Sequence, residues 1–113
     1  MIKFYLLFIF LSYTNFLLAQ KSKADSLYTL LAKEKADTTR VKFLWQIADA
    51  VINYNPDSSL SLARKSLSLA QKIKYTEGES RATGVIGSTF IKIGNYPKAL
   101  EYYLQKLRIE EQR

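Results

Sequence analysis

The stretch IGSTFIKIGNYPKALEYY, residues 86–103, decides the fold, because two apolar runs with helical spacing meet there at Gly-Asn-Tyr-Pro. Gly94 suits the left-handed conformation that ends many helices, and Pro97 suits the first turn of a new helix. Gly87 lies inside the first run, where a missing side chain lets a neighbouring helix approach closely. The stretch therefore predicts two helices joined by a tight turn.

Helical spacing of apolar residues continues over the rest of the chain, and no segment has the alternation of a half-buried strand. The sequence therefore predicts an all-α fold, in which about five helices joined by short turns follow an N-terminal leader and pack as antiparallel neighbours. The helix starts are predicted from capping residues and prolines. They are Asp25 in an N-terminal helix spanning residues 20–36, Asp37, Asp57 or Ser58, about Glu79, and Pro97.

The composition limits the function classes. The chain has 113 residues, of which 48% are apolar and 24% charged, which fits one small globular domain. It has no Cys and no His, so it lacks disulfides, Cys/His metal sites and the usual general acid or base near neutral pH. The acidic pairs and the serines form no catalytic pattern. We therefore predict no enzyme activity, no cofactor and no metal site.

The N-terminus has the features of a secretory signal. Lys3 precedes an apolar segment of roughly 16 residues, shorter than the ~20 needed to span a bilayer. We predict a signal peptide over residues 1–19, cleaved after Ala19, and an exported protein that is periplasmic or secreted and not stably inserted in the membrane. An uncleaved membrane anchor is the alternative. No Cys follows the apolar segment, which excludes a lipoprotein.

The net charge of +7 raises the question of an anionic partner. The basic residues are scattered at helical surface spacing with carboxylates among them, which indicates a solvated surface. We therefore predict no nucleic-acid binding.

Internal repetition is visible at a shift of about forty residues. Four apolar or small residues of one run align with four of a second run, which gives eight repeat positions. The first run has Leu44, Ile47, Ala48 and Val51, and the second has Thr83, Ile86, Gly87 and Phe90. Counted from Ser80, the small and aromatic residues of residues 80–113 resemble the tetratricopeptide repeat (TPR), a 34-residue helix-turn-helix unit. This resemblance implies a right-handed solenoid of two units, a divergent one at residues 37–79 and a well-matched one at residues 80–113.

A second resemblance covers nearly the whole chain. Four features follow one another along the chain: a leader, Asp25-Ser26-Leu27, Asp37-Thr38-Thr39-Arg40-Val41, and repeats containing SLAQKI at residues 68–73. In this order they are similar to the N-terminal sensor region of bacterial TPR histidine kinases and regulators frequent in Bacteroidetes. This resemblance implies a periplasmic sensing or scaffolding segment, and we expect the chain to be a fragment of a longer protein. The alternatives are a self-associating structural module and a regulatory subunit of a signalling complex.

The TPR resemblance also implies a peptide groove along the first helix of each unit. The predicted groove residues are Lys42, Trp45, Asp49, Ile52, Asn53, Arg81, Gly84, Ser88, Ile91 and Lys92. Trp45 is the strongest candidate, since an indole offers a large contact area and one donor. The alternatives are that Trp45 packs near Leu30 or Leu31, and that the charged residues form a solvated face.

The last helix is predicted to expose a contact face, because a repeat unit buries its apolar side against a neighbour. Tyr102, Leu104 and Ile109 are expected to be partly uncovered there. The expected partners are a protein or peptide and, alternatively, a second copy of the chain that docks on this face to form a homodimer.

Overall fold

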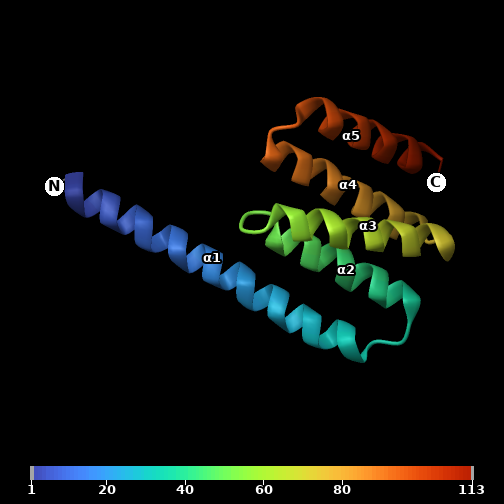
Figure 1. Ribbon diagram of the computed structural model, residues 1–113, viewed down its shortest axis with the longest axis horizontal. Helices are drawn as coiled ribbons and strands as arrows, with labels where there is room; N and C mark the ends of the chain where they lie inside the picture. Colours follow the sequence, from blue (N-terminus) through green and yellow to red (C-terminus); the bar gives the residue numbers. More distant parts are fainter. Residues whose placement is uncertain (1, 113) are drawn as a thin grey trace.

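The computed structural model describes residues 2–112, and in that range it is all-α, as predicted. Its five helices are α1 (Ile2–Lys33), α2 (Asp37–Val51), α3 (Pro56–Lys72), α4 (Thr76–Ile93) and α5 (Tyr96–Glu111). Each helix packs against the next in antiparallel order, and α2 also contacts α4 (Figure 1). The contact between α2 and α4 brings together two helices that are separated in the sequence by α3.

Helix α1 differs from the prediction, which separated the leader from a helix capped by Asp25. Asp25 lies inside one continuous helix of 32 residues, about 48 Å long at 1.5 Å per residue. The segment contains no Gly or Pro, and the hydroxyls of Ser12 and Thr14 donate to carbonyl oxygens of the preceding turn at 2.9 Å. Nothing in the sequence therefore interrupts the helix at the end of the leader.

The two halves of α1 have different surroundings. The N-terminal half extends beyond the other helices (Figure 1), and its large apolar side chains are exposed. By length and composition α1 is able to cross a membrane, a property that signal sequences share. In the C-terminal half Ala24 is buried, and Leu27 and Leu31 pack against the core. The structure is thus compatible with a signal peptide or an anchor attached to a helical bundle.

The N-termini of α3 and α5 are capped by asparagines that the sequence analysis did not identify. Asn55 accepts a hydrogen bond from the Ser58 amide at 3.1 Å, and Asn95 accepts one from the Lys98 amide at 3.2 Å. A proline stands in the first turn of both helices, as expected for a helix start. The prediction that Asp57 or Ser58 caps α3 is therefore wrong, because Asn55 already occupies the cap position.

Helix α2 begins at Asp37, as predicted, but without a side-chain cap: the residue before it is Ala36. Glu34 organises this turn instead, since its carboxylate accepts hydrogen bonds from the amides of Lys35 and Ala36 at 3.1 and 3.0 Å. Its carbonyl oxygen also accepts one from the Arg40 guanidinium at 3.2 Å. Asp37 lies in the first turn of the helix, where a negative charge is favourable.

Helix α4 begins at Thr76, three residues before the predicted start near Glu79. Gly78 is buried in its first turn, where a side chain would collide with Tyr75 and Val41. The helix ends as predicted at Gly94, which has φ of 90°, and the Asn95 amide donates to the Phe90 carbonyl oxygen at 2.9 Å. This bond between residues five apart is a Schellman motif.

The core contains the eight repeat positions that the sequence analysis aligned, and all eight are buried. They are Leu44, Ile47, Ala48 and Val51 on α2, and Thr83, Ile86, Gly87 and Phe90 on α4. Two buried serines of α3 join this core to its neighbours. The Ser59 hydroxyl lies 3.0 Å from the Thr89 hydroxyl, and Ser66 donates to the Val41 carbonyl oxygen at 2.8 Å. In residues 2–112 every buried side-chain polar atom has a hydrogen-bond partner.

Candidate functional site

A groove lies where α2, α4 and α5 meet, with a volume of about 250 Å³. Its lining comes from all three helices: Trp45, Asp49, Arg81, Gly84, Val85, Ser88, Tyr103 and Lys106. Trp45 and Asp49 are one turn apart on α2, and the contact between α2 and α4 brings them beside Arg81. Five of the predicted groove residues therefore share one hollow, namely Trp45, Asp49, Arg81, Gly84 and Ser88.

Trp45 and Arg81 form the most specific contact of the groove. The guanidinium carbon of Arg81 lies 5.6 Å from the centroid of the Trp45 ring, which is within the range of a cation–π interaction. Trp45 is half-buried and packs against the core, whereas Arg81 is exposed. Of the two neighbours that the alternative prediction gave to Trp45, Leu30 is exposed, whereas Leu31 packs against the same core as Trp45. The pair of Trp45 and Arg81 places an aromatic surface and a positive charge at the groove.

Helix α5 supplies two groove residues that the sequence analysis missed. The Tyr103 and Ser88 hydroxyls lie 2.7 Å apart, so Tyr103 contributes a polar tip as well as a core ring. The Lys106 ammonium donates to the Ser80 hydroxyl at 2.9 Å and forms an ion pair with the Glu110 carboxylate at 2.7 Å. The side chain of Lys106 lies over Gly84, which has no side chain of its own, and this contact depends on the packing of α5 on α4.

Five predicted groove residues lie outside the hollow. They are Lys42, Ile52, Asn53, Ile91 and Lys92. Asn53 follows the last residue of α2, and its side-chain amide donates to the Gln20 side-chain oxygen of α1 at 3.3 Å. Lys42 and Lys92 are exposed. The three basic residues predicted for the groove are therefore separated: Lys42 and Lys92 lie outside the hollow, and Arg81 is joined there by Lys106.

The turn between α2 and α3 lies near α1, as the hydrogen bond between Asn53 and Gln20 shows. Partial burial raises the pKa of Tyr54 above its usual value of 10.0, and the nearby Asp25 carboxylate and Tyr28 raise it further. Both neighbours belong to α1, which places Tyr54 close to the same part of α1 as the bond between Asn53 and Gln20.

The predicted contact face on α5 is wrong for Ile109, which is only 8% exposed. Tyr102 is partly uncovered, as predicted, and its ring stacks on Phe90 with centroids 5.6 Å apart, so both Tyr102 and Ile109 face α4. These two residues are seven apart, which places them on the same side of a helix. Leu104 is exposed, as predicted. The exposed apolar residues of α5 instead form a stripe at helical spacing: Tyr96, Leu100, Leu104 and Leu107.

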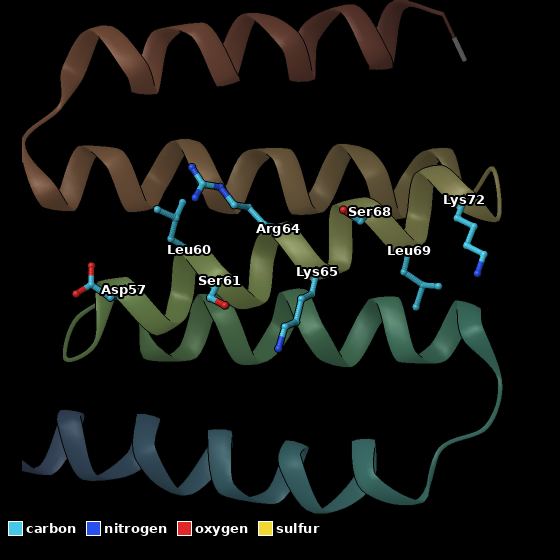
Figure 2. A pocket seen from close by; sticks show the side chains of 8 residues that line it. All are labelled: Asp57, Leu60, Ser61, Arg64, Lys65, Ser68, Leu69 and Lys72. Atoms are coloured by element: carbon cyan, nitrogen blue, oxygen red, sulfur yellow. The ribbon is translucent and has the colours of Figure 1, made fainter.

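A larger hollow, of about 650 Å³, lies over α3 (Figure 2). All eight residues that line it belong to that one helix, among them Arg64, Lys65 and Lys72. Figure 2 shows these side chains spread along the helix, with Arg64 and Lys65 pointing to opposite sides. A binding site usually needs polar groups that converge from several elements. The side chains of this surface do not converge, so we assign no binding site to it.

No family model, no curated protein and no solved structure matches this chain.

Proposed function

We propose that this chain is an exported, non-catalytic protein-interaction module built from TPR-like helix pairs, and that its groove binds a peptide segment of a partner protein. The observation that carries this proposal is the cation–π contact of Arg81 with Trp45, beside Asp49 and Ser88, in a hollow lined by three helices. Aromatic and arginine side chains dominate the binding energy of many protein interfaces. A scaffolding role in sensing fits the sequence resemblance to sensor regions.

The TPR-like arrangement is supported by features that recur one repeat apart. Asn55 and Asn95, forty residues apart, cap their helices through the amide three residues later. Ser66 on α3 bonds to Val41 on α2, and forty residues later Lys106 on α5 bonds to Ser80 on α4. Helix α2 packs on α3 within the first unit and α4 packs on α5 within the second, while the contacts of α4 with α2 and α3 join the units in the order expected of stacked repeats.

The size of the groove favours a peptide over a small-molecule cofactor. Its volume of about 250 Å³ is below the roughly 300–1,000 Å³ of typical small-molecule sites. It suits one or two side chains of an extended or helical segment. Arg81 favours an acidic side chain of the ligand, and the exposed carboxylate of Asp49 favours a backbone or side-chain donor next to it.

The proposal is tested by selecting peptides from a random displayed library on the exported, purified chain. We expect selected peptides to lose about 30-fold or more in affinity with Trp45→Ala, since a buried interface anchor contributes ~2 kcal/mol or more. Arg81→Lys keeps the charge but loses the planar stack, so it should also weaken binding. Lys92→Ala, outside the hollow, is the matched control and should leave the affinity unchanged.

Circular dichroism of each variant checks that the helices remain. If no peptide is selected whose affinity depends on Trp45 and Arg81, the groove does not bind peptides and the proposal fails.

The exposed apolar stripe of α5 favours a second candidate function, self-association. Leu100, Leu104 and Leu107 are 60%, 47% and 50% exposed, and lie on one side of the helix. Contiguous apolar surface of this kind marks many interaction sites. If the stripe forms a dimer interface, Leu104→Glu should convert the dimer to a monomer in light scattering. Lys98→Glu, which places the same charge off the stripe, should not. A monomer at micromolar concentrations before any substitution excludes this candidate.

A further inference from the structure

Gln20 becomes the first residue of the exported chain if the leader is removed after Ala19, and this inference rests on the proposed export. Its side chain is half-buried beside the turn that follows α2. There the Gln20 side-chain oxygen accepts a hydrogen bond from the Asn53 side-chain amide at 3.3 Å. After cleavage Gln20 would therefore carry both a side-chain carboxamide and a new α-amine, and its side chain is held in a defined position by Asn53.

We propose that Gln20 of the exported chain is a modification site that closes to pyroglutamate. The Gln20 α-amine, in its neutral form, attacks the side-chain amide carbon and forms a carbon–nitrogen bond in a five-membered ring. The bond from that carbon to the side-chain nitrogen breaks, and this nitrogen leaves as ammonia after taking up the proton that the amine loses. The product is a lactam, no group is oxidised or reduced, and no co-reactant is consumed.

The contact with Asn53 favours this ring closure and remains compatible with its product. A donor at the side-chain oxygen stabilises the negative charge that develops there when the amine attacks. The lactam keeps that same oxygen as its carbonyl oxygen, so the hydrogen-bond acceptor is retained in the product.

The charges around Gln20 give the modification a structural effect. After cleavage the remaining part of α1 starts with an α-ammonium group followed closely by Lys21 and Lys23. Positive charges at a helix N-terminus oppose the helix dipole. Lactam formation removes the ammonium charge, as other N-terminal blocking groups do. It should therefore protect the first turn of this helix, whose packing on the core begins with Ala24.

The experiment is mass spectrometry of the full chain, produced with its own leader in an exporting bacterial host. A glutamate-specific protease then releases the N-terminal peptides up to Glu34. We expect the first peptide to begin at residue 20 and to be lighter by one ammonia than the linear sequence. Asn53→Ala should slow this mass change several-fold in a time course. Gln20→Glu should keep a free amine over the same time, because a carboxylate is a much poorer electrophile.

The outcomes separate the inference from the proposal on which it rests. A peptide that begins at Gln20 and keeps a free amine overturns the modification and leaves export intact. A chain that retains residues 1–19, or begins elsewhere, overturns the proposed cleavage and this inference together. Equal rates for the parent chain and Asn53→Ala overturn the role assigned to Asn53.

Discussion

Gly87 and Gly84 provide a direct test of the close approach between α4 and α5. Both glycines lie inside α4, so replacing either by Ala gains about 0.8–1.0 kcal/mol of helix propensity. Their surroundings differ. A side chain at Gly87 would lie 3.2–3.3 Å from three atoms of the Tyr103 ring, whereas one at Gly84 would meet the aliphatic chain of Lys106 at 3.1 Å.

The two neighbours respond differently to an added methyl group. The Tyr103 ring is rigid, and its hydroxyl is held 2.7 Å from that of Ser88, so it is unable to withdraw without loss of that contact. Overpacking of this kind costs about 1–3 kcal/mol, which exceeds the gain in propensity. The ammonium of Lys106 is held by Ser80 and Glu110, but the atom that meets the new methyl group is Cδ of a flexible chain, which is able to shift while the ammonium keeps these bonds. We therefore expect Gly87→Ala to lower the free energy of unfolding by about 1 kcal/mol, and Gly84→Ala to raise it by about 0.5–1 kcal/mol.

Urea denaturation followed by circular dichroism measures both changes, with equal slopes as the check that the compared states are the same. In a Tyr103→Leu background the ring is gone, so Gly87→Ala should become stabilising by about 0.5–1 kcal/mol. The reasoning is refuted if Gly87→Ala stabilises the parent chain as much as Gly84→Ala does. It is also refuted if the Tyr103→Leu background leaves the effect of Gly87→Ala unchanged.

Three further predictions follow from the ends and the surface of the helices. Lys74 has φ of 58° and Gly94 has φ of 90°, so both adopt the left-handed conformation that favours glycine. In the same urea assay Lys74→Gly should therefore stabilise the fold by about 0.5–1 kcal/mol, and Gly94→Ala should destabilise it by about 1 kcal/mol. Ile109→Ala should cost about 2–4 kcal/mol and Leu104→Ala less than about 0.5 kcal/mol, a ranking that thermal denaturation checks. The pKa of Tyr54 is raised on folding, so its contribution to stability is present below pH 10.0 and lost as the pH rises through the folded value. Tyr54→Phe should remove that alkaline loss, measured as urea midpoints at about pH 9 and 11.

The sequence predicts most of the core because the same helical spacing occurs twice. Ile47 and Ile86 are fully buried at equivalent positions, and Gly94 ends α4 in the left-handed conformation that its glycine allows. The capping residues were harder to predict, since the segment around Asn55 offers several polar side chains and only the path of the chain selects one. The sequence prediction placed the start of α4 three residues too late, because Gly78 is a residue typical of turns.

The groove was predictable from α2 and α4 but not from α5. Trp45 and Arg81 lie together because α2 and α4 contact each other, and both residues were among the groove positions predicted from the TPR resemblance. Lys106 was missed because its position depends on the length of its side chain and on its bonds to Ser80 and Glu110. Asn53 was placed in the groove by register alone, yet it lies beyond the end of α2, where the helical register no longer applies.

The repeat also explains why the apolar stripe of α5 is exposed. Leu60 and Leu67 on α3 are half-buried, and the residues forty positions later, Leu100 and Leu107 on α5, are exposed. The two helices differ in their neighbours, because α3 lies between α2 and α4 whereas α5 contacts only α4 within residues 2–112. The exposure of Leu100 and Leu107 therefore follows from the single helical neighbour of α5 in residues 2–112 and not from a change in the helix itself. A helix that covers the stripe should present small residues, as α4 presents Ala82 and Thr89 in its own buried surface.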